Sequence, residues 1–282
     1  MPELPEVETI CRGLRKHAVG LKIRDVTVRM PKVTNVTAKE LRKATIGATI
    51  KDVQRRAKTI NIHLSNNLWM VIHLKISGQL LYLPKAEPVK EHTHIIFDLS
   101  NGYTLRFWDL RQFGYVRLFD KAGYRRFMDE LGFGPEPLEK GFTLERFRQM
   151  LASKPGARIK PLLMDQTFIS GIGNLYADEI LFYARIHPLT RAGSLKESQV
   201  RNIYRGIKKI LALGIKKRGS SVELYVDVEG RPGGFVPYIK AYGREGKPCK
   251  RCGTPIKRIK IGSRSASFCP KCQLEPVGVP AK

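Results

Sequence analysis

The apolar positions near the start of the chain repeat with the period of a helix. They follow the i, i+3, i+4, i+7 pattern at Val7, Ile10, Cys11 and Leu14. Pro5 suits the first helical turn, where a missing N–H donor costs nothing. The pattern predicts a helix over residues 5–16, and it places Cys11 in the hydrophobic core.

From about residue 21 to residue 120 the apolar positions change to the pattern of short β-strands. Asn-Gly, Ser-Asn-Asn and Pro-Lys turn sequences separate these strands. The predicted strands are 23–28, 46–53, 59–64, 69–74, 93–99, 104–108 and 115–119. Because no helix is predicted between them, seven short strands favour a β-sandwich or a barrel.

The second half of the chain is mainly helical in pattern. Residues 131–140 (LGFGPEPLEK) contain two glycines and two prolines, which is typical of a linker. The predicted helices beyond it are 143–153, 158–165, 174–186 and 195–217. Residues 218–236 carry glycines near both ends and predict a mobile loop. The chain has no internal repeat, and its 282 residues suffice for about two domains.

The charge of the chain narrows the class of partner. Lys and Arg number 51 against 25 acidic residues, giving a net charge of +26 that is spread along the sequence. This excess favours a nucleic acid over a membrane surface, since no basic amphipathic helix stands out in the sequence. A generally basic proteome is the alternative explanation. No apolar stretch is long enough for a membrane span, and the acidic start differs from a targeting peptide, so we expect a cytoplasmic protein.

Four cysteines near the C-terminus have the spacing of a zinc site. Two C-x2-C pairs on tight turns are separated by 16 residues, and the four residues are Cys249, Cys252, Cys269 and Cys272. Disulfides are the alternative, but the chain has no secretory signal. Four thiolates leave no open coordination position, so the zinc is expected to be structural. Residues 256–261 and 266–268 predict a β-hairpin between the pairs.

Pro2 is a candidate nucleophile. Removal of Met1 leaves a secondary amine with an ordinary pKa of about 7.7–8, so part of it is neutral at physiological pH. Such an amine can attack C1′ of a sugar and form an iminium, which is covalent catalysis without a lysine. The alternative is that Pro2 is an inert N-terminal residue.

Five motifs occur together in a fixed order along the chain. They are PELPEVET (2–9), IHLKISGQL (72–80), DLRQFG (109–114), FISGIGNLYADEILF (168–182) and SRSASFCPKCQ (263–273). This combination resembles the Fpg/Nei family of DNA glycosylases, and PELPE at the start is similar to its formamidopyrimidine-DNA glycosylase branch. The resemblance implies a bifunctional repair enzyme that removes 8-oxoguanine and formamidopyrimidines from duplex DNA and then cleaves the strand.

The resemblance also implies an α+β multidomain architecture. We expect an N-terminal catalytic β-sandwich domain with an N-terminal helix at 1–130 and a linker at 131–141. A helix–two-turn–helix domain is expected at 142–238, with a loop at 218–236 that closes over the flipped base. A zinc ribbon is expected at 239–282. The resemblance further implies one structural Zn²⁺ and no organic cofactor. We expect the partner to be duplex DNA that contains a lesion, and the protein to be a monomer.

The catalytic roles implied by the resemblance fall on five residues. Pro2 is implied to form the Schiff base, and Glu3 to act as the acid and base that assist base loss and ring opening. Glu6 is implied to shape the same pocket. Lys58, within RRAKTI, resembles the lysine that binds phosphate and assists β-elimination. Arg264 resembles the ribbon arginine that grips the phosphates flanking the lesion and is tied to δ-elimination.

Further residues match DNA-contacting positions of the family. Asn174 resembles a residue that contacts phosphate from a helix start, and His92, Arg111 and Lys160 are implied to contact DNA. Extrusion of a base leaves a gap that wedge side chains can fill. The implied void-filling residues are Ile76, Arg111 and Phe113.

This chain departs from the family pattern at two neighbouring positions. Ile76 stands where Met is usual and Lys75 where Gly is common, so lesion search can differ. Two of the implied contacts have simpler alternatives, because Phe113 could be a core residue and His92 a strand-surface residue. The 218–236 loop also departs from known patterns, which leaves base specificity open.

Three other functions remain open from the sequence. An endonuclease VIII-like enzyme would prefer oxidised pyrimidines, although the PELPE start and the loop length favour the formamidopyrimidine branch. A non-catalytic zinc protein that binds damaged DNA would not require intact Pro2, Glu3 and Lys58. A bare zinc-ribbon transcription or ribosomal factor would leave the first 240 residues unexplained.

Overall fold

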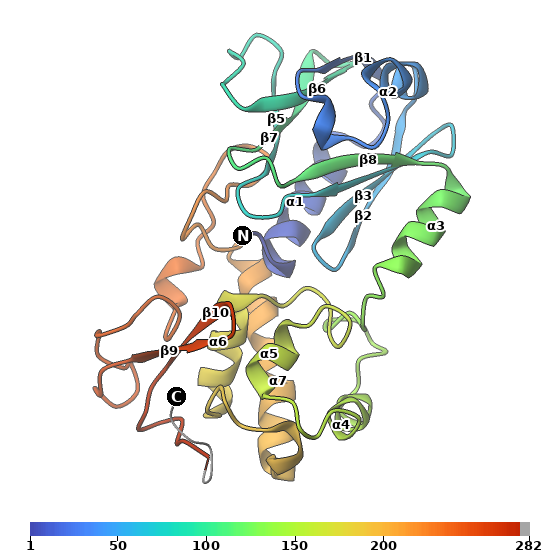
Figure 1. Cartoon of the computed structure of the whole chain (residues 1–282). Helices are drawn as coiled ribbons and strands as arrows, with labels where there is room; N and C mark the ends of the chain where they lie inside the picture. Colours follow the sequence, from blue (N-terminus) through green and yellow to red (C-terminus); the bar gives the residue numbers. More distant parts are fainter. Residues whose placement is uncertain (277–282) are drawn as a thin grey trace. The chain divides into compact units, whose positions relative to one another are not determined.

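The computed structural model describes residues 1–276, and its internal contacts divide the chain into two compact units. The first unit contains Met1–Leu131 and Gly214–Val236. The second contains Gly132–Leu213 and the chain from Pro237 onward. Figure 1 labels the elements of both units.

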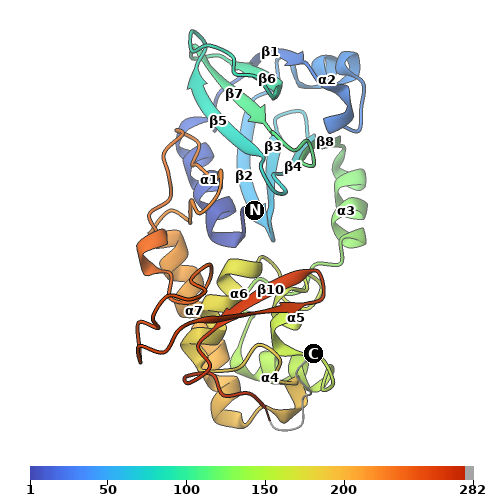
Figure 2. The same cartoon turned by 60° about the vertical axis from the view of Figure 1, so that its left-hand side comes forward.

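The first unit is built on two four-stranded antiparallel sheets. One sheet has the strand order β1 (Ile23–Val28), β6 (Thr93–Leu99), β7 (Tyr103–Trp108) and β5 (Gln79–Pro84). The other has the order β2 (Ile50–Arg56), β3 (Thr59–Leu64), β4 (Trp69–His73) and β8 (Tyr115–Phe119). Figure 2 shows both sheets of this unit, and the arrangement confirms the predicted β-sandwich.

Apolar residues of the strands and the N-terminal helix form most of the core of this sandwich. On β3, Ile60, Ile62 and Leu64 are buried in the same hydrophobic cluster. The helix α1 (Leu4–His17) contacts β2 and β3, and its apolar stripe lies in that cluster. The predicted helix over residues 5–16 is therefore confirmed. Burial raises the pKa of the Cys11 thiol to about 12, which leaves it an unreactive core group.

Two helices, one 3₁₀ turn and one strand of the first unit were missed by the hydrophobic pattern. The helix α2 (Ala38–Thr45) starts with a capping box, and the helix α3 (Lys121–Glu130) is capped by an aspartate but buries no residue. The 3₁₀ turn η1 is Pro31–Val33. Because α2 ends just before Ile46, the strand predicted from residue 46 begins only at Ile50. β5 was also missed, so the unit has eight strands instead of seven.

The segment 218–236 packs onto the first unit. Tyr225 and Val228 belong to its hydrophobic core, and the Tyr82 N–H donates to the Val228 carbonyl at 2.7 Å. Gly13 makes room for this packing, since a Cβ added there would lie 2.4 Å from Val228 Cγ2. The segment was predicted within a helical domain ending at residue 238, and that boundary stays a prediction, as does mobility of the segment.

The second unit is mainly helical. Its helices are α4 (Leu144–Ala152), α5 (Ile159–Met164), α6 (Asn174–Ala184) and α7 (Glu197–Lys216), of which the last three residues of α7 fall in the first unit. The 3₁₀ turns are η2 (Ala192–Ser194) and η3 (Val236–Tyr238), the latter starting at the unit boundary. All four helices lie within the ranges predicted from the sequence.

A two-stranded antiparallel hairpin completes the second unit. Its strands are β9 (Lys257–Ile261) and β10 (Arg264–Phe268), as predicted for the stretch between the cysteine pairs. β10 contacts α6, and both views show the hairpin beside α6 (Figures 1 and 2). Across residues 1–276, the structure has no helix with both the length and the apolar character needed to cross a membrane.

Candidate active site

The N-terminus leads into α1 through buried acidic residues. Glu3 and Glu6 are buried and form a capping box, in which the Glu3 N–H donates to Glu6 Oε2 at 2.8 Å. Pro2 is buried directly before this turn. The N-terminal nitrogen of Met1 lies 2.8 Å from Glu223 Oε2. The Pro2 nitrogen is an amide in the full chain and becomes a free secondary amine once Met1 is removed.

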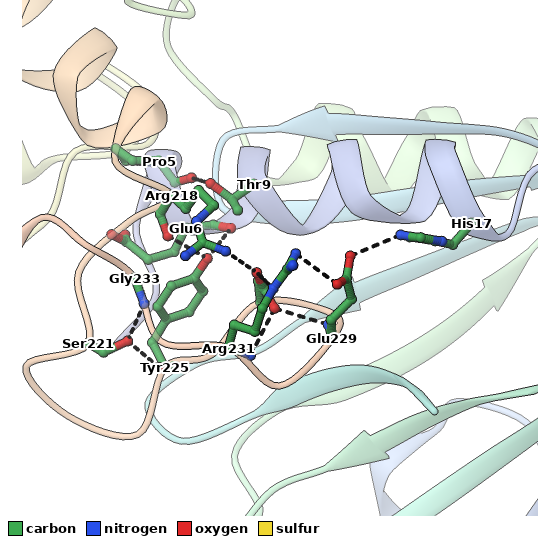
Figure 3. Close-up of polar contacts among 11 residues, drawn as sticks. Pro5, Glu6, Thr9, His17, Arg218, Ser221, Tyr225, Glu229, Arg231 and Gly233 are labelled. Atoms are coloured by element: carbon green, nitrogen blue, oxygen red, sulfur yellow. Dashed lines mark hydrogen bonds and ion pairs between the residues drawn. The ribbon is translucent and has the colours of Figure 1, made fainter. Parts of the chain in front are cut away.

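Glu6 ties the segment 218–236 to α1 (Figure 3). Its Oε1 accepts the Ser220 N–H at 2.8 Å, and its backbone carbonyl accepts the Tyr225 hydroxyl at 3.4 Å. Gly219 has φ of 79°, and a Cβ added there would lie 2.8 Å from Glu6 Cγ, so this position requires glycine. Burial raises the pKa of Tyr225 well above its ordinary value. Glu6 thus accepts two backbone N–H groups, one at the start of its own helix and one from the segment 218–236, and its implied role in shaping a pocket stays a prediction.

A second group of polar contacts involves residues 227–231 of the same segment (Figure 3). Asp227 Oδ2 lies 3.2 Å from Arg218 Nη1 and 3.2 Å from Arg231 Nε. Glu229 Oε1 lies 3.0 Å from His17 Nε2 on the last turn of α1. The segment is therefore held to the helix that follows the N-terminus at two separate turns.

Lys58 lies in the turn between β2 and β3, next to a histidine of β4. The turn includes Ala57 at φ of 51°, and Lys58 itself is buried. Thr59 pairs with His73, whose Nδ1 accepts the Lys75 N–H at 2.9 Å. Burial, followed by the charges of Lys75 and Lys58, lowers the pKa of His73 to about 3. The neutral His73 side chain therefore supports the turn at Lys75. This role could not be predicted from the sequence, where His73 is a single histidine within a strand.

A buried carboxylate organises two turns of the first unit. Asp109 Oδ1 accepts the Ser77 hydroxyl at 2.5 Å, and Oδ2 accepts the Gly114 N–H at 2.7 Å. Ser77 Oγ in turn accepts the Arg111 N–H at 2.9 Å. These two turns carry the residues predicted to fill the gap left by a flipped base, namely Ile76, Arg111 and Phe113. Asp109 was not predicted as a site residue, although it opens the DLRQFG motif.

Of the three predicted gap-filling residues, Arg111 and Phe113 are exposed and Ile76 is half-buried. Phe113 is 56% exposed, which excludes its alternative interpretation as a core residue. The Arg111 guanidinium lies 5.2 Å from the centre of the Phe113 ring. His92 precedes β6 with φ of 63°, and its carbonyl accepts the Asp109 N–H at 3.1 Å. The predicted DNA-contacting residues of this unit are therefore linked through the backbone and side chain of Asp109.

We expect Asp109→Asn to lower the free energy of unfolding by about 2–3 kcal/mol, because an amide cannot accept from all the donors around Asp109. Urea unfolding followed by tryptophan fluorescence would measure the change, since Trp69 and Trp108 both lie in this unit. The exposed Asp129→Asn is the matched control, with a change within about 0.5 kcal/mol. Equal unfolding midpoints for the two variants would contradict the role given to Asp109.

In the second unit, Asn174 and Arg264 line one surface hollow of about 480 Å³. Asn174 begins α6, and its buried Oδ1 has no hydrogen-bond partner among the described residues. Arg258 and Lys260 of β9 also line the hollow, and Arg258 Nη1 lies 3.7 Å from Glu245 Oε2. A helix N-terminus beside several cations suits an anionic ligand such as a phosphate. The structure thus brings together two of the predicted DNA-contacting residues.

Lys160 has a different environment from the one predicted. Its Nζ lies 2.5 Å from Asp178 Oδ1 and donates to the Ser265 carbonyl at 2.5 Å. The side chain is 2% exposed, so its ammonium group does not reach the surface in this conformation. A direct DNA contact by Lys160 is therefore not supported by its burial. Its partners lie 18 and 105 residues away along the sequence, where no local pattern could indicate them.

The four clustered cysteines fit a structural zinc ion. Their Sγ atoms all lie within 4.8 Å of one another, and Cys252 Sγ is 3.5 Å from both Cys269 Sγ and Cys272 Sγ. A tetrahedron with Zn–S bonds of about 2.3 Å requires sulfur separations of about 3.8 Å. Cys249 and Cys269 also lie in a small hydrophobic cluster with Phe182 of α6. All five cysteines of the chain are free thiols in the structure.

Comparison with known proteins covers nearly the whole chain. Residues 1–116 match the formamidopyrimidine-DNA glycosylase N-terminal domain, residues 133–226 its H2TH domain, and residues 246–274 the zinc finger found in FPG and IleRS. A formamidopyrimidine-DNA glycosylase from Pelotomaculum thermopropionicum is 43% identical, with 97% of this chain and 99% of the relative covered. The chain belongs to the formamidopyrimidine-DNA glycosylase family.

Solved structures of the family have the same fold. The Lactococcus lactis Fpg bound to abasic-site DNA matches with a TM-score of 0.90 and 32% identity, covering 97% of this chain and 100% of that one. A mutant of the same enzyme with DNA containing Fapy-dG matches with a TM-score of 0.91 and 33% identity at the same coverage. These matches confirm the predicted family, fold class and zinc finger. They also exclude a bare zinc-ribbon factor, since residues 1–116 and 133–226 match the other family domains.

Proposed function

We propose that this chain is a bifunctional DNA glycosylase and AP lyase of base excision repair that acts on oxidised purines in duplex DNA. The observation that carries this proposal is the match over 97% of the chain to formamidopyrimidine-DNA glycosylases, with Pro2 and Glu3 intact at its start. The substrates we assign are 8-oxoguanine and formamidopyrimidine lesions.

The first chemical step uses the amine that Met1 removal creates. The Pro2 nitrogen attacks C1′ of the damaged nucleotide, and the bond from C1′ to the base breaks with its electron pair going to the base. Glu3 is placed in the adjacent buried turn, where it can deliver the proton that the departing base requires. Opening of the sugar ring then leaves an iminium between Pro2 and C1′.

Strand cleavage follows because the iminium makes the neighbouring C2′ proton acidic. Loss of a C2′ proton expels the 3′ phosphate, and a second elimination expels the 5′ phosphate. Lys58 is assigned to the first elimination, while Arg264 and Asn174 hold phosphates in the hollow that they share. Cys249, Cys252, Cys269 and Cys272 would hold a structural zinc ion, which would stiffen the ribbon.

Access to the base requires it to leave the helical stack. We assign filling of the gap to the exposed pair Phe113 and Arg111, which contact each other, together with Ile76 on the adjoining turn. We assign a DNA contact to His92 on the neighbouring turn. We assign contact with the flipped base to the segment 218–236, which Glu6 anchors.

An enzyme for oxidised pyrimidines is the second candidate. It is supported by the Lactococcus lactis Fpg structure that contains DNA with an oxidised pyrimidine, at 33% identity and a TM-score of 0.90. The two candidates share the Pro2 chemistry and differ in the base accepted, so a set of lesion duplexes separates them.

Borohydride trapping tests the proposal. A reduced covalent adduct is expected on a duplex with 8-oxoguanine opposite cytosine, and none on the undamaged duplex. Mass spectrometry of the same sample should show that Met1 is absent. An adduct on a thymine glycol duplex alone would favour the second candidate. Binding without any adduct, with Met1 absent, would leave a protein that only binds damaged DNA.

The remaining assignments follow from this function. We place the protein in the bacterial cytoplasm, associated with the nucleoid through DNA binding, and expect it to act as a monomer. The relatives reported above are bacterial, and the net charge of +26 favours a polyanionic partner.

A further inference from the structure

An ion pair is buried in the second unit beneath the hairpin. Lys160 of α5 and Asp178 of α6 are 2% and 1% exposed, and their charged atoms lie 2.5 Å apart. Burial raises the pKa of Asp178 to about 7, while the charge of Lys160 opposes this effect. Removing two charges from water costs as much as their attraction returns, so such a pair is a poor source of stability by itself.

Both members of the pair also bind the backbone of β10. The Lys160 ammonium donates to the Ser265 carbonyl at 2.5 Å, and Asp178 Oδ2 accepts the Ser267 N–H at 2.9 Å. These two backbone groups lie one and three residues after Arg264, the first residue of the strand. The pair therefore fixes the strand directly behind the arginine, while the arginine side chain remains exposed.

The same contacts fix the strand relative to the start of α6. Asp178 follows Asn174 by four residues, which places both on one face of the helix. Asn174 and Arg264 line the same hollow, so the bond from Asp178 to Ser267 sets the distance across it. Glu179 makes a separate attachment, since its carboxylate accepts the backbone N–H groups of residues 240–242.

We propose that the Lys160–Asp178 pair is a positioning element that holds Arg264 opposite Asn174, so that both side chains bind the phosphates of one DNA strand. This inference rests on the proposed function, because phosphate binding by Arg264 belongs to that function. It assigns Lys160 a role through Arg264, in place of a direct contact with DNA.

A double-mutant cycle tests the inference by measuring the Kd for a duplex with a tetrahydrofuran abasic-site analogue. Asp178→Asn is expected to weaken binding about 10-fold in the wild-type background. In the Arg264→Ala background the same change is expected to weaken it less than about 2-fold, because the arginine to be positioned is absent. The salt slope should fall by about 1 in both single variants.

Two controls separate positioning from general damage to the fold. Combining Asp178→Asn with Arg111→Ala, in the other unit, should give additive effects. The pair Lys160→Met with Asp178→Asn leaves no unpaired buried charge, so it should recover thermal stability and zinc content but still bind weakly. If Asp178→Asn alone does not fold, this neutral double variant takes its place in the cycle.

The outcomes are distinct. Equal effects of Asp178→Asn with and without Arg264 would overturn the inference and leave the pair as a stabilising contact only. Recovery of wild-type affinity in the neutral double variant would also overturn it. Failure of the wild-type protein to form a borohydride adduct would instead overturn the proposed chemistry, while the Kd values would still decide the positioning role.

Discussion

Pro2→Gly is expected to lower the rate of 8-oxoguanine excision by at least about 100-fold, equivalent to about 2.7 kcal/mol of transition-state stabilisation. Glycine also permits Met1 removal, but it leaves a primary amine on an unconstrained backbone in place of the fixed ring nitrogen. The reacting atom must be aligned with C1′, and small errors of position are costly. Single-turnover cleavage and the yield of borohydride adduct would measure the loss.

Glu3→Gln provides the comparison that assigns the two roles. An amide cannot deliver a proton, so base loss should slow by about 10²–10⁴-fold. A preformed abasic site has no base to lose, and on that duplex the variant should keep most of its trapped adduct. The exposed Glu130→Gln serves as the control for the substitution itself.

The activities of the two variants on the 8-oxoguanine duplex and on the abasic duplex distinguish a nucleophile from a proton donor. Pro2→Gly should fail on both the 8-oxoguanine and the abasic duplex, whereas Glu3→Gln should fail on the first alone. Normal adduct from Pro2→Gly on both duplexes would contradict a requirement for the ring nitrogen. If peptide mapping then places the adduct away from the N-terminus, another amine is the nucleophile. Lys58 would then be the first candidate, because it lies buried in the β2–β3 turn.

The parts of the fold that were predictable have strong local patterns. The bounds of β1, β3, β6 and β8 equal the predicted ranges, because their alternating residues are bordered by turn sequences. The cysteine spacing likewise predicted the cluster that the structure contains. In these stretches, local sequence and tertiary packing favour the same conformation.

The elements that were missed depend on contacts between distant residues. α2 was missed because its eight residues include only one large apolar side chain, Leu41, although Thr37 and Glu40 form a capping box at its start. The segment 218–236 has the glycines of a loop, and nothing local indicates that Tyr225 and Val228 enter the core. Its anchor at Glu6 joins residues 214 positions apart.

In the candidate site, too, residues within local motifs were predictable and residues that depend on distant contacts were not. Motifs indicated the residues whose side chains face solvent or ligand, such as Phe113 and Arg264. The buried residues that hold them were missed, as with Asp109, or given another role, as with Lys160. A buried carboxylate surrounded by backbone donors leaves no spacing rule in the sequence, because its partners come from separate turns and strands.

Loss of zinc is expected to disrupt the ribbon while leaving the first unit folded. A structural Zn²⁺ site contributes about 10–16 kcal/mol of binding free energy, far more than the small cluster around Cys249 and Cys269 can replace. Cys269→Ala should therefore release the metal, increase proteolysis between residues 249 and 272, and weaken DNA binding at least as much as Arg264→Ala.

Tryptophan fluorescence can test whether the first unit stays folded when zinc is lost. The chain has two tryptophans, Trp69 and Trp108, and both lie in the first unit, so their fluorescence reports on that unit. Cys269→Ala should leave the urea midpoint of this signal unchanged. Cys11→Ala should do the opposite, because it removes a fully buried core atom of the first unit and no zinc ligand.

Cys11→Ala and Cys269→Ala should therefore differ in opposite directions in zinc content, in the fluorescence midpoint and in DNA affinity. Metal analysis should give one zinc per chain for Cys11→Ala and none for Cys269→Ala, while the fluorescence midpoint falls only for the former. DNA affinity should follow the zinc content, because Arg264 and its neighbours stand on the hairpin between the cysteine pairs. A metal-free Cys269→Ala with unchanged affinity would contradict this dependence, and it would mean that the Lys160 and Asp178 contacts with β10 hold the hairpin in its binding position without the metal.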